Sequence, residues 1–152
     1  MTTAFTTFMP QALDAARAAG ERGEVPVGAV IVSSGGEVVA VAGNETRARP
    51  DPTAHAEMLA IRHACARLGV ERLTGCTIWV TLEPCPMCAA AIAHARLARV
   101  CYGASDPKSG GIETGPCLYT HANLHHRPEI IAGLDARECG ALLQEFFQKK
   151  RR

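Results

Sequence analysis

The chain has 152 residues, 47% of them hydrophobic and 20% charged, and a formal net charge of +1. This length suits one domain, residues 1–152, with a core large enough to need no disulfide bonds. The composition excludes a disordered or fibrous chain, and no apolar run approaches the roughly 18 residues that a transmembrane helix needs.

The predicted elements alternate between helices and strands after an initial hairpin. Apolar residues with helical spacing indicate the helices, and short β-rich runs indicate the strands. In chain order, we expect a helix over 12–22, strands over 27–32 and 37–42, a helix over 53–68 with Asp51 or Thr53 as N-cap, a strand over 77–82, a helix over 86–97, strands over 99–103 and 129–132, and a helix over 135–148. This order predicts a mixed five-stranded sheet with helices on both faces, a three-layer α/β/α sandwich.

The cysteines and the N-terminus bear on the cellular compartment. No Lys or Arg precedes an apolar stretch in the first ten residues, so a secretory signal is not expected. Seven cysteines without an export signal are better interpreted as reduced thiols than as a disulfide framework, and we expect a cytoplasmic protein. Five of them are predicted to be small buried hydrophobic residues: Cys65, Cys76, Cys101, Cys117 and Cys139.

Two short clusters supply groups that bind metals and move protons. The first is His55-Ala56-Glu57, and the second is Pro84-Cys85-Pro86-Met87-Cys88. A catalytic zinc site needs three protein ligands and an open fourth position for water, and two cysteines with one histidine are a known set. We therefore predict that His55, Cys85 and Cys88 bind one Zn²⁺ per chain and that Glu57 stays unbound.

The residues around these clusters predict how they meet. Pro86 fits the first position of a helix, which makes Cys85 the N-cap and places Cys88 on the same face. The positive end of that helix favours the thiolate form of cysteine. His55 and Glu57 would point apart in a regular helix, so their convergence requires His55 to lie in an irregular first turn or Glu57 to reach around.

The expected chemistry follows from the unbound carboxylate. Zinc lowers the pKa of a bound water to about 7, and Glu57 would take that proton, deliver it to a ring nitrogen and assist the departure of ammonia. An isolated Cys-x-x-Cys is alternatively half of a structural zinc site or a redox pair. A structural site would close with a fourth ligand. His94 is the nearest candidate, and we expect it to lie on a helix face or to make an ordinary hydrogen bond instead.

Three segments, 24–30, 53–57 and 81–89, resemble bacterial tRNA-specific adenosine deaminases of the cytidine/deoxycytidylate deaminase superfamily. The resemblance extends over nearly the whole chain, including residues 102–104, His126 and the end of the chain from Phe146. It implies a cytidine deaminase-like fold. It also implies a zinc-dependent homodimer that converts adenosine to inosine at the wobble position of an arginine tRNA.

The same resemblance suggests substrate contacts. Asn44 matches the position whose amide meets the purine and ribose, and an amide can pair with adenine, although Gly-Asn alone indicates a turn. Asp106, Lys108 and Arg127 are implied RNA contacts by resemblance only. Ser105 stands where many relatives carry Arg, which puts a charged RNA contact at this position in doubt.

The zinc motif predicts the reaction more firmly than the base, because deaminases of cytosine, guanine and deoxycytidylate share this chemistry. The loop from Asp106 and the basic end, 149–152, favour tRNA, since phosphate contacts would position an anticodon loop. Taken alone, the basic end is better interpreted as a solvated helix terminus. The alternatives are a deaminase of guanine or another free base and a noncatalytic, zinc-stabilised binding module.

Overall fold

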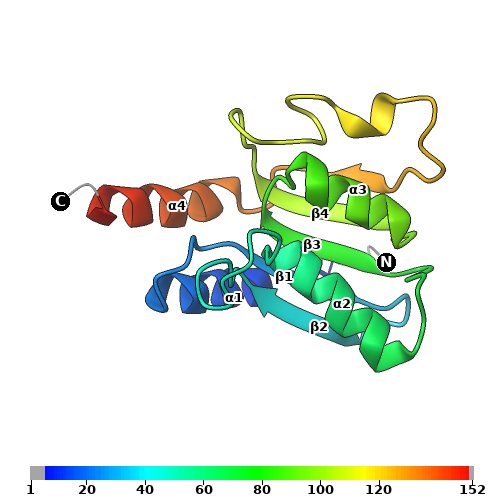
Figure 1. Cartoon of the computed structure of the whole chain (residues 1–152), viewed down its shortest axis with the longest axis horizontal. Coiled ribbons are helices and arrows are strands. Elements are labelled where there is room, and N and C mark those ends of the chain that lie inside the picture. Colours follow the sequence, from blue (N-terminus) through cyan, green and yellow to red (C-terminus); the bar gives the residue numbers. More distant parts are fainter. Residues whose placement is uncertain (1–5, 151–152) are drawn as a thin grey trace, which may run out of the picture.

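The computed structural model describes residues 6–150, and its elements form three layers (Figure 1). Every predicted helix and strand is present, with most ends shifted by a few residues. In chain order the elements are α1 (Met9–Glu21), β1 (Gly28–Val32), β2 (Val38–Gly43), α2 (Ala56–Leu68), β3 (Thr77–Leu82), α3 (Pro86–His94), β4 (Arg99–Ala104), the 3-10 turn η1 (Leu118–Thr120), β5 (Glu129–Ile131) and α4 (Ala136–Lys150).

The five strands form one mixed sheet in the order β2-β1-β3-β4-β5. Strand β1 runs antiparallel to β2 and β3, whereas β3, β4 and β5 are parallel. The ends of β2, β3 and β4 therefore lie at one edge of the sheet, together with the start of β1. Asn44, Glu83 and Ser105 directly follow those three strand ends, so the topology gathers the motif-bearing loops at this edge.

Alternation along the strands divides the core between the two faces. Ile31 and Ile78 pack in the cluster that includes residues of α2 and α3. Val30 and Trp79 pack in the cluster that includes residues of α1 and α4. The predicted three-layer α/β/α sandwich is therefore confirmed.

Two of the sequence predictions about local structure are wrong in detail. The helix predicted over 86–97 ends at His94, because Arg96 adopts a left-handed φ of 60° that no helix continues through. Cys76, Cys101 and Cys139 are buried as expected, whereas two others are only partly buried. These are Cys65, near the end of α2, and Cys117, in the surface segment before η1.

Among residues 6–150, no helix combines the length and apolarity required to cross a membrane.

Candidate metal centre and active site

The histidine of the first motif lies at the start of α2, outside its regular turns. His55 is the N-cap, with extended backbone (φ −72°, ψ 153°), and the helix begins at Ala56. The predicted N-cap, Asp51 or Thr53, is therefore wrong. Asp51 instead accepts hydrogen bonds from the backbone N–H of Thr53 (2.8 Å) and from its hydroxyl (2.7 Å), which closes a local turn before the helix.

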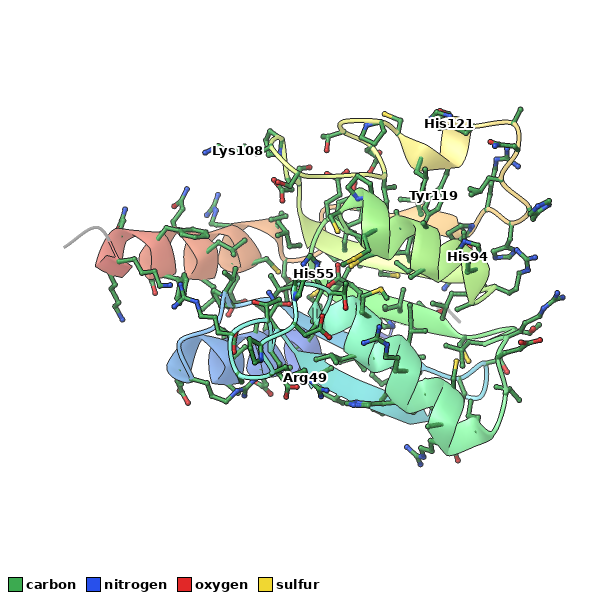
Figure 2. All side chains as sticks on the ribbon, viewed as in Figure 1. Arg49, His55, His94, Lys108, Tyr119 and His121 are labelled. Atoms are coloured by element: carbon green, nitrogen blue, oxygen red, sulfur yellow. The ribbon has the colours of Figure 1, made fainter. Side chains whose placement is uncertain are left out.

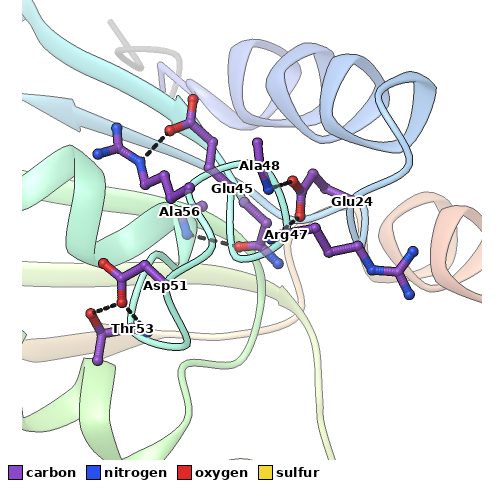
Figure 3. A network of polar contacts seen from close by, with 9 residues as sticks. Glu24, Glu45, Arg47, Ala48, Asp51, Thr53 and Ala56 are labelled. Carbon is purple, nitrogen blue, oxygen red and sulfur yellow. Dashed lines mark hydrogen bonds and ion pairs between the residues drawn. The ribbon is translucent and has the colours of Figure 1, made fainter.

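The side chain that caps the start of α2 belongs to Asn44, which directly follows the end of β2. The Oδ1 atom of Asn44 accepts the Ala56 N–H at 2.8 Å, so it satisfies one of the unpaired donors at the helix start. Figure 3 shows this loop, with the bond to Ala56 and the Asp51–Thr53 turn. Because the backbone of His55 is extended, its side chain does not have the direction that a regular helix would give it relative to Glu57. This is the first of the two predicted arrangements, in which His55 lies outside the regular turns of the helix.

The cysteines lie at the start of α3, as the sequence predicted. Cys85 is the N-cap with extended backbone, Pro86 is the first helical residue, and Cys88 is buried one turn later. The Nδ1 atom of His55 lies 3.7 Å from the sulfur of Cys85 and 3.5 Å from that of Cys88. Two helix starts thus place three donor groups around one point.

This arrangement matches the coordination that zinc requires. The donor atoms of His55, Cys85 and Cys88 all lie within 4.8 Å of one another. Usual Zn–N and Zn–S lengths with tetrahedral angles put the nitrogen and sulfur about 3.6 Å apart, close to both distances above. The cluster therefore fits one zinc ion per chain. Figure 2 shows His94 at the opposite end of α3 from His55, where it is exposed, so it does not complete the cluster.

The protonation of the two thiols is coupled through their contact. A hydrogen bond from Cys88, assisted by one from His55, lowers the pKa of Cys85 to about 4. Cys88 is the donor in that bond and is buried, so its pKa is raised. The hydrogen bond to Cys85 also raises the pKa of His55. The arrangement therefore favours the thiolate of Cys85, the form of cysteine that binds a cation.

Glu57 lies beside this cluster without belonging to it. Its side chain is on the first turn of α2, and the residue is 4% exposed. Burial raises the pKa of Glu57 to about 7, although a hydrogen bond from its own backbone N–H and the charge of His55 oppose the shift. A carboxyl group with such a pKa can both accept and release a proton near neutral pH.

The residues predicted to contact the substrate also make hydrogen bonds within the protein. Asp106 accepts hydrogen bonds from the backbone N–H groups of Lys108 and Ser109, at 3.1 and 3.0 Å, and so shapes its loop. Lys108 is exposed on that loop (Figure 2). The Arg127 guanidinium donates to the carbonyl oxygens of three residues: Tyr119, His121 and Leu124. Their contacts with RNA, like that of Asn44, stay predictions.

At the C-terminal end, Lys149 and Lys150 are exposed in the last turn of α4. The ammonium group of Lys150 lies 4.9 Å from the centre of the Phe146 ring, a cation–π distance. The remaining two residues of the basic end, Arg151 and Arg152, lie outside the described residues.

Two buried carboxylates near the site had no role in the sequence predictions. Glu24 and Glu83 are each 2% exposed, and each accepts hydrogen bonds from the backbone of a distant loop. Burial alone would raise both pKa values, but these bonds lower them below the ordinary value. A charged residue at the end of an apolar strand, as at Glu83, is the one sequence signal that indicates such a role.

The Glu24 carboxylate gives a stability prediction. It accepts the N–H groups of Arg47 (3.1 Å) and Ala48 (2.9 Å), as Figure 3 shows. Glu24→Gln should lower the free energy of unfolding near neutral pH by about 1 to 2 kcal/mol, the scale of a lost hydrogen bond to a charged group. Because the folded-state pKa is lowered, this contribution is present above the ordinary value of 4.5 and is lost as the pH falls through the folded-state pKa.

Urea denaturation near pH 7 and at about pH 3 measures this difference, with Glu37→Gln in the exposed hairpin turn as control. A difference between wild type and Glu24→Gln that is equally large at both pH values would contradict the assignment.

Comparison with known proteins agrees with this geometry. Residues 3–104 match the family described as the cytidine and deoxycytidylate deaminase zinc-binding region. The chain therefore belongs to the cytidine and deoxycytidylate deaminase family. Within it, the resemblance to tRNA-specific adenosine deaminases is confirmed. The chain is 52% identical to the one from Agrobacterium fabrum over 146 residues, which are 96% of this chain and 95% of that protein.

Solved structures of deaminases also match the fold of this chain. One, from a study of A-to-I editing by tRNA:A34 deaminases at the wobble position of transfer RNA, has a TM-score of 0.88 and 52% identity, covering 90% of this chain and 98% of that chain. A guanine deaminase from Bacillus subtilis has a TM-score of 0.64 and 41% identity, covering 68% of this chain and 66% of that chain.

Proposed function

We propose that this protein is a zinc-dependent hydrolase that converts adenosine to inosine at the wobble position of tRNA. The observation that carries the proposal is the 52% identity to a tRNA-specific adenosine deaminase across 96% of the chain. That similarity reaches well beyond the zinc motif, which deaminases of several bases share. By the same resemblance, we propose the anticodon loop of an arginine tRNA as the substrate and the cytoplasm as the compartment.

The residues of the site have separate tasks in this reaction. His55, Cys85 and Cys88 would hold the zinc, which supplies a Lewis acid that makes water nucleophilic at neutral pH. Glu57 would accept the proton of the attacking water at its carboxylate and pass it to a ring nitrogen. It would then take the second proton of that water from the hydroxyl group now on C6 and give it to the amino group, as the bond between this group and C6 breaks and ammonia leaves.

Asn44 would orient the base. Its Oδ1 atom already accepts the Ala56 N–H, so the amide NH₂ group is the part of the side chain that remains to donate to a purine or ribose. The bond to Ala56 fixes the amide beside His55 and Glu57, which start the same helix.

The placement of basic groups supports an RNA substrate. Lys108 is on the loop that follows β4, at the edge of the sheet where the metal cluster lies. The C-terminal part of α4 extends beyond the sheet on the same side (Figure 1), and it carries Lys149 and Lys150. Such residues would contact phosphates and position an anticodon loop, whose unstacked base can enter a pocket.

We also propose a homodimer, as the resemblance implies. The outer surface of α3 supports it, since Met87, Ala90 and Ala91 remain partly exposed there. Light scattering should give twice the chain mass of 16.1 kDa. A mass of one chain would contradict this part of the proposal.

The second candidate is a guanine deaminase, which the 41% identity to the Bacillus subtilis enzyme over 68% of this chain favours. Incubation of the purified protein with tRNA and, separately, with free guanine and adenine distinguishes the two when ammonia and inosine are measured. Inosine in tRNA supports the proposal, and ammonia from guanine alone would overturn it. No ammonia from any substrate would favour a noncatalytic zinc-binding module.

A further inference from the structure

Glu83 lies two residues before the first cysteine of the cluster, and the hydrogen bonds of its carboxylate all go to one loop. Its Oε2 atom accepts three successive backbone N–H groups, at 3.2, 2.9 and 3.0 Å: Ile112, Glu113 and Thr114. Its Oε1 atom accepts the N–H of Asp106 at 3.1 Å. Successive N–H groups that point to one place form an anion-binding nest, so one carboxylate ties together both ends of the segment 106–114.

The same segment is pressed against the start of α3. The N–H of Gly111 donates to the carbonyl oxygen of Pro84 at 2.9 Å. A Cβ atom on Gly111 would lie 2.6 Å from the nitrogen of Pro86, and one on Gly110 would lie 2.6 Å from the carboxyl carbon of Glu83. Only glycine allows this approach, so the backbone of the segment is fixed directly beside the N-terminal turn that presents the cysteines.

We propose that Glu83 is a positioning residue for the RNA substrate. It holds the segment 106–114 in the one arrangement that presents Asp106 and Lys108 at the edge of the sheet where the metal cluster lies. Glu83 does not touch the substrate, because its carboxylate is buried and already surrounded by loop donors. This inference rests on the proposed function, since it assigns the segment 106–114 to binding of the polynucleotide rather than to the chemical step.

The isosteric amide tests the geometry sharply. Both oxygens of Glu83 face backbone N–H groups, so in Glu83→Gln one of them is replaced by an NH₂ group that faces a donor in either orientation. The variant must therefore lose either the contact with Asp106 or the contacts with residues 112–114. The volume and shape of the side chain are nearly unchanged, so the core around it stays filled.

The experiment combines steady-state kinetics on an anticodon stem-loop RNA with amide hydrogen exchange of the zinc-loaded protein. In Glu83→Gln we expect faster exchange at residues 106 and 112–114 and zinc still near one per chain. We expect KM for the RNA to rise about tenfold or more, the equivalent of one lost charge-assisted hydrogen bond, and kcat to change less than about threefold.

A milder variant keeps the test independent of folding. Thr114→Val removes a hydroxyl whose single proton is shared between the Glu83 carboxylate (3.1 Å) and the carbonyl oxygen of Asp106 (2.9 Å), so it should shift exchange and KM in the same direction by less. Val30→Ala is the control: it costs stability in the core against α1 and α4, and it should leave KM unchanged.

The outcomes separate this inference from the proposed function. Unchanged exchange at residues 106 and 112–114 in Glu83→Gln would overturn it, and so would faster exchange with an unchanged KM, or a lower kcat at an unchanged KM. If the wild-type protein forms no inosine in RNA, the proposed function fails and the binding role of Glu83 fails with it. In that case the exchange measurement alone still shows whether Glu83 holds the segment.

Discussion

Glu57→Gln is expected to abolish deamination while the zinc content stays near one per chain. The variant keeps the shape of the side chain but cannot carry a proton between the attacking water and the purine. Loss of general acid–base catalysis costs about 10²- to 10⁴-fold in rate. Inosine formation and zinc content, measured on the same preparation, test this expectation.

Two comparisons make the Glu57 result specific. Glu37→Gln, in the exposed hairpin turn at the opposite edge of the sheet, should leave both quantities unchanged. Loss of zinc in Glu57→Gln would show that the carboxylate is a ligand. Full activity with zinc retained would remove Glu57 as the proton carrier.

Cys88→Ser should lose the metal and, with it, both activity and stability. The site is built by two helix starts, so a bound ion links α2 to α3 and stabilises the folded chain through its binding free energy. At a free zinc concentration about 1,000 times Kd, that linkage is worth about 4 kcal/mol. Thermal unfolding with and without a chelator, together with metal analysis, measures the loss.

Cys65→Ser is the matched control for Cys88→Ser, because it removes a partly buried thiol of α2 that lies outside the cluster. This control should keep its zinc and its response to chelator. If Cys88→Ser still bound one zinc ion with unchanged stability, the ligands would have to be sought elsewhere in the chain.

Much of the fold and the metal cluster could be predicted because their signals are local. The apolar runs at 77–82 and 99–103 predict buried strands, and Pro86 directly after Cys85 indicates a helix start. A cysteine pair three residues apart and a histidine at another helix start need only the expected topology to meet. The structure places them within coordination distance of one ion.

The parts that sequence reasoning missed depend on contacts between distant segments. Asp51 looked like a cap for α2, but Asn44 takes that role from the end of β2. Likewise, the loops that Glu24 and Glu83 hold lie far along the chain from them. The place of Glu83 at the end of an apolar strand indicates a structural role, but no short-range pattern identifies the partner, because that partner is a backbone N–H that every residue other than proline carries.

The substrate claim is tested most directly by locating the inosine. The zinc-loaded protein is incubated with an arginine tRNA transcript that has adenosine at the wobble position and with a matched transcript that has guanosine there. Sequencing then maps inosine residue by residue. We expect inosine at the wobble position of the first transcript and none in the second. Inosine at other adenosines of both transcripts, or none in either while free guanine is deaminated, would contradict this expectation.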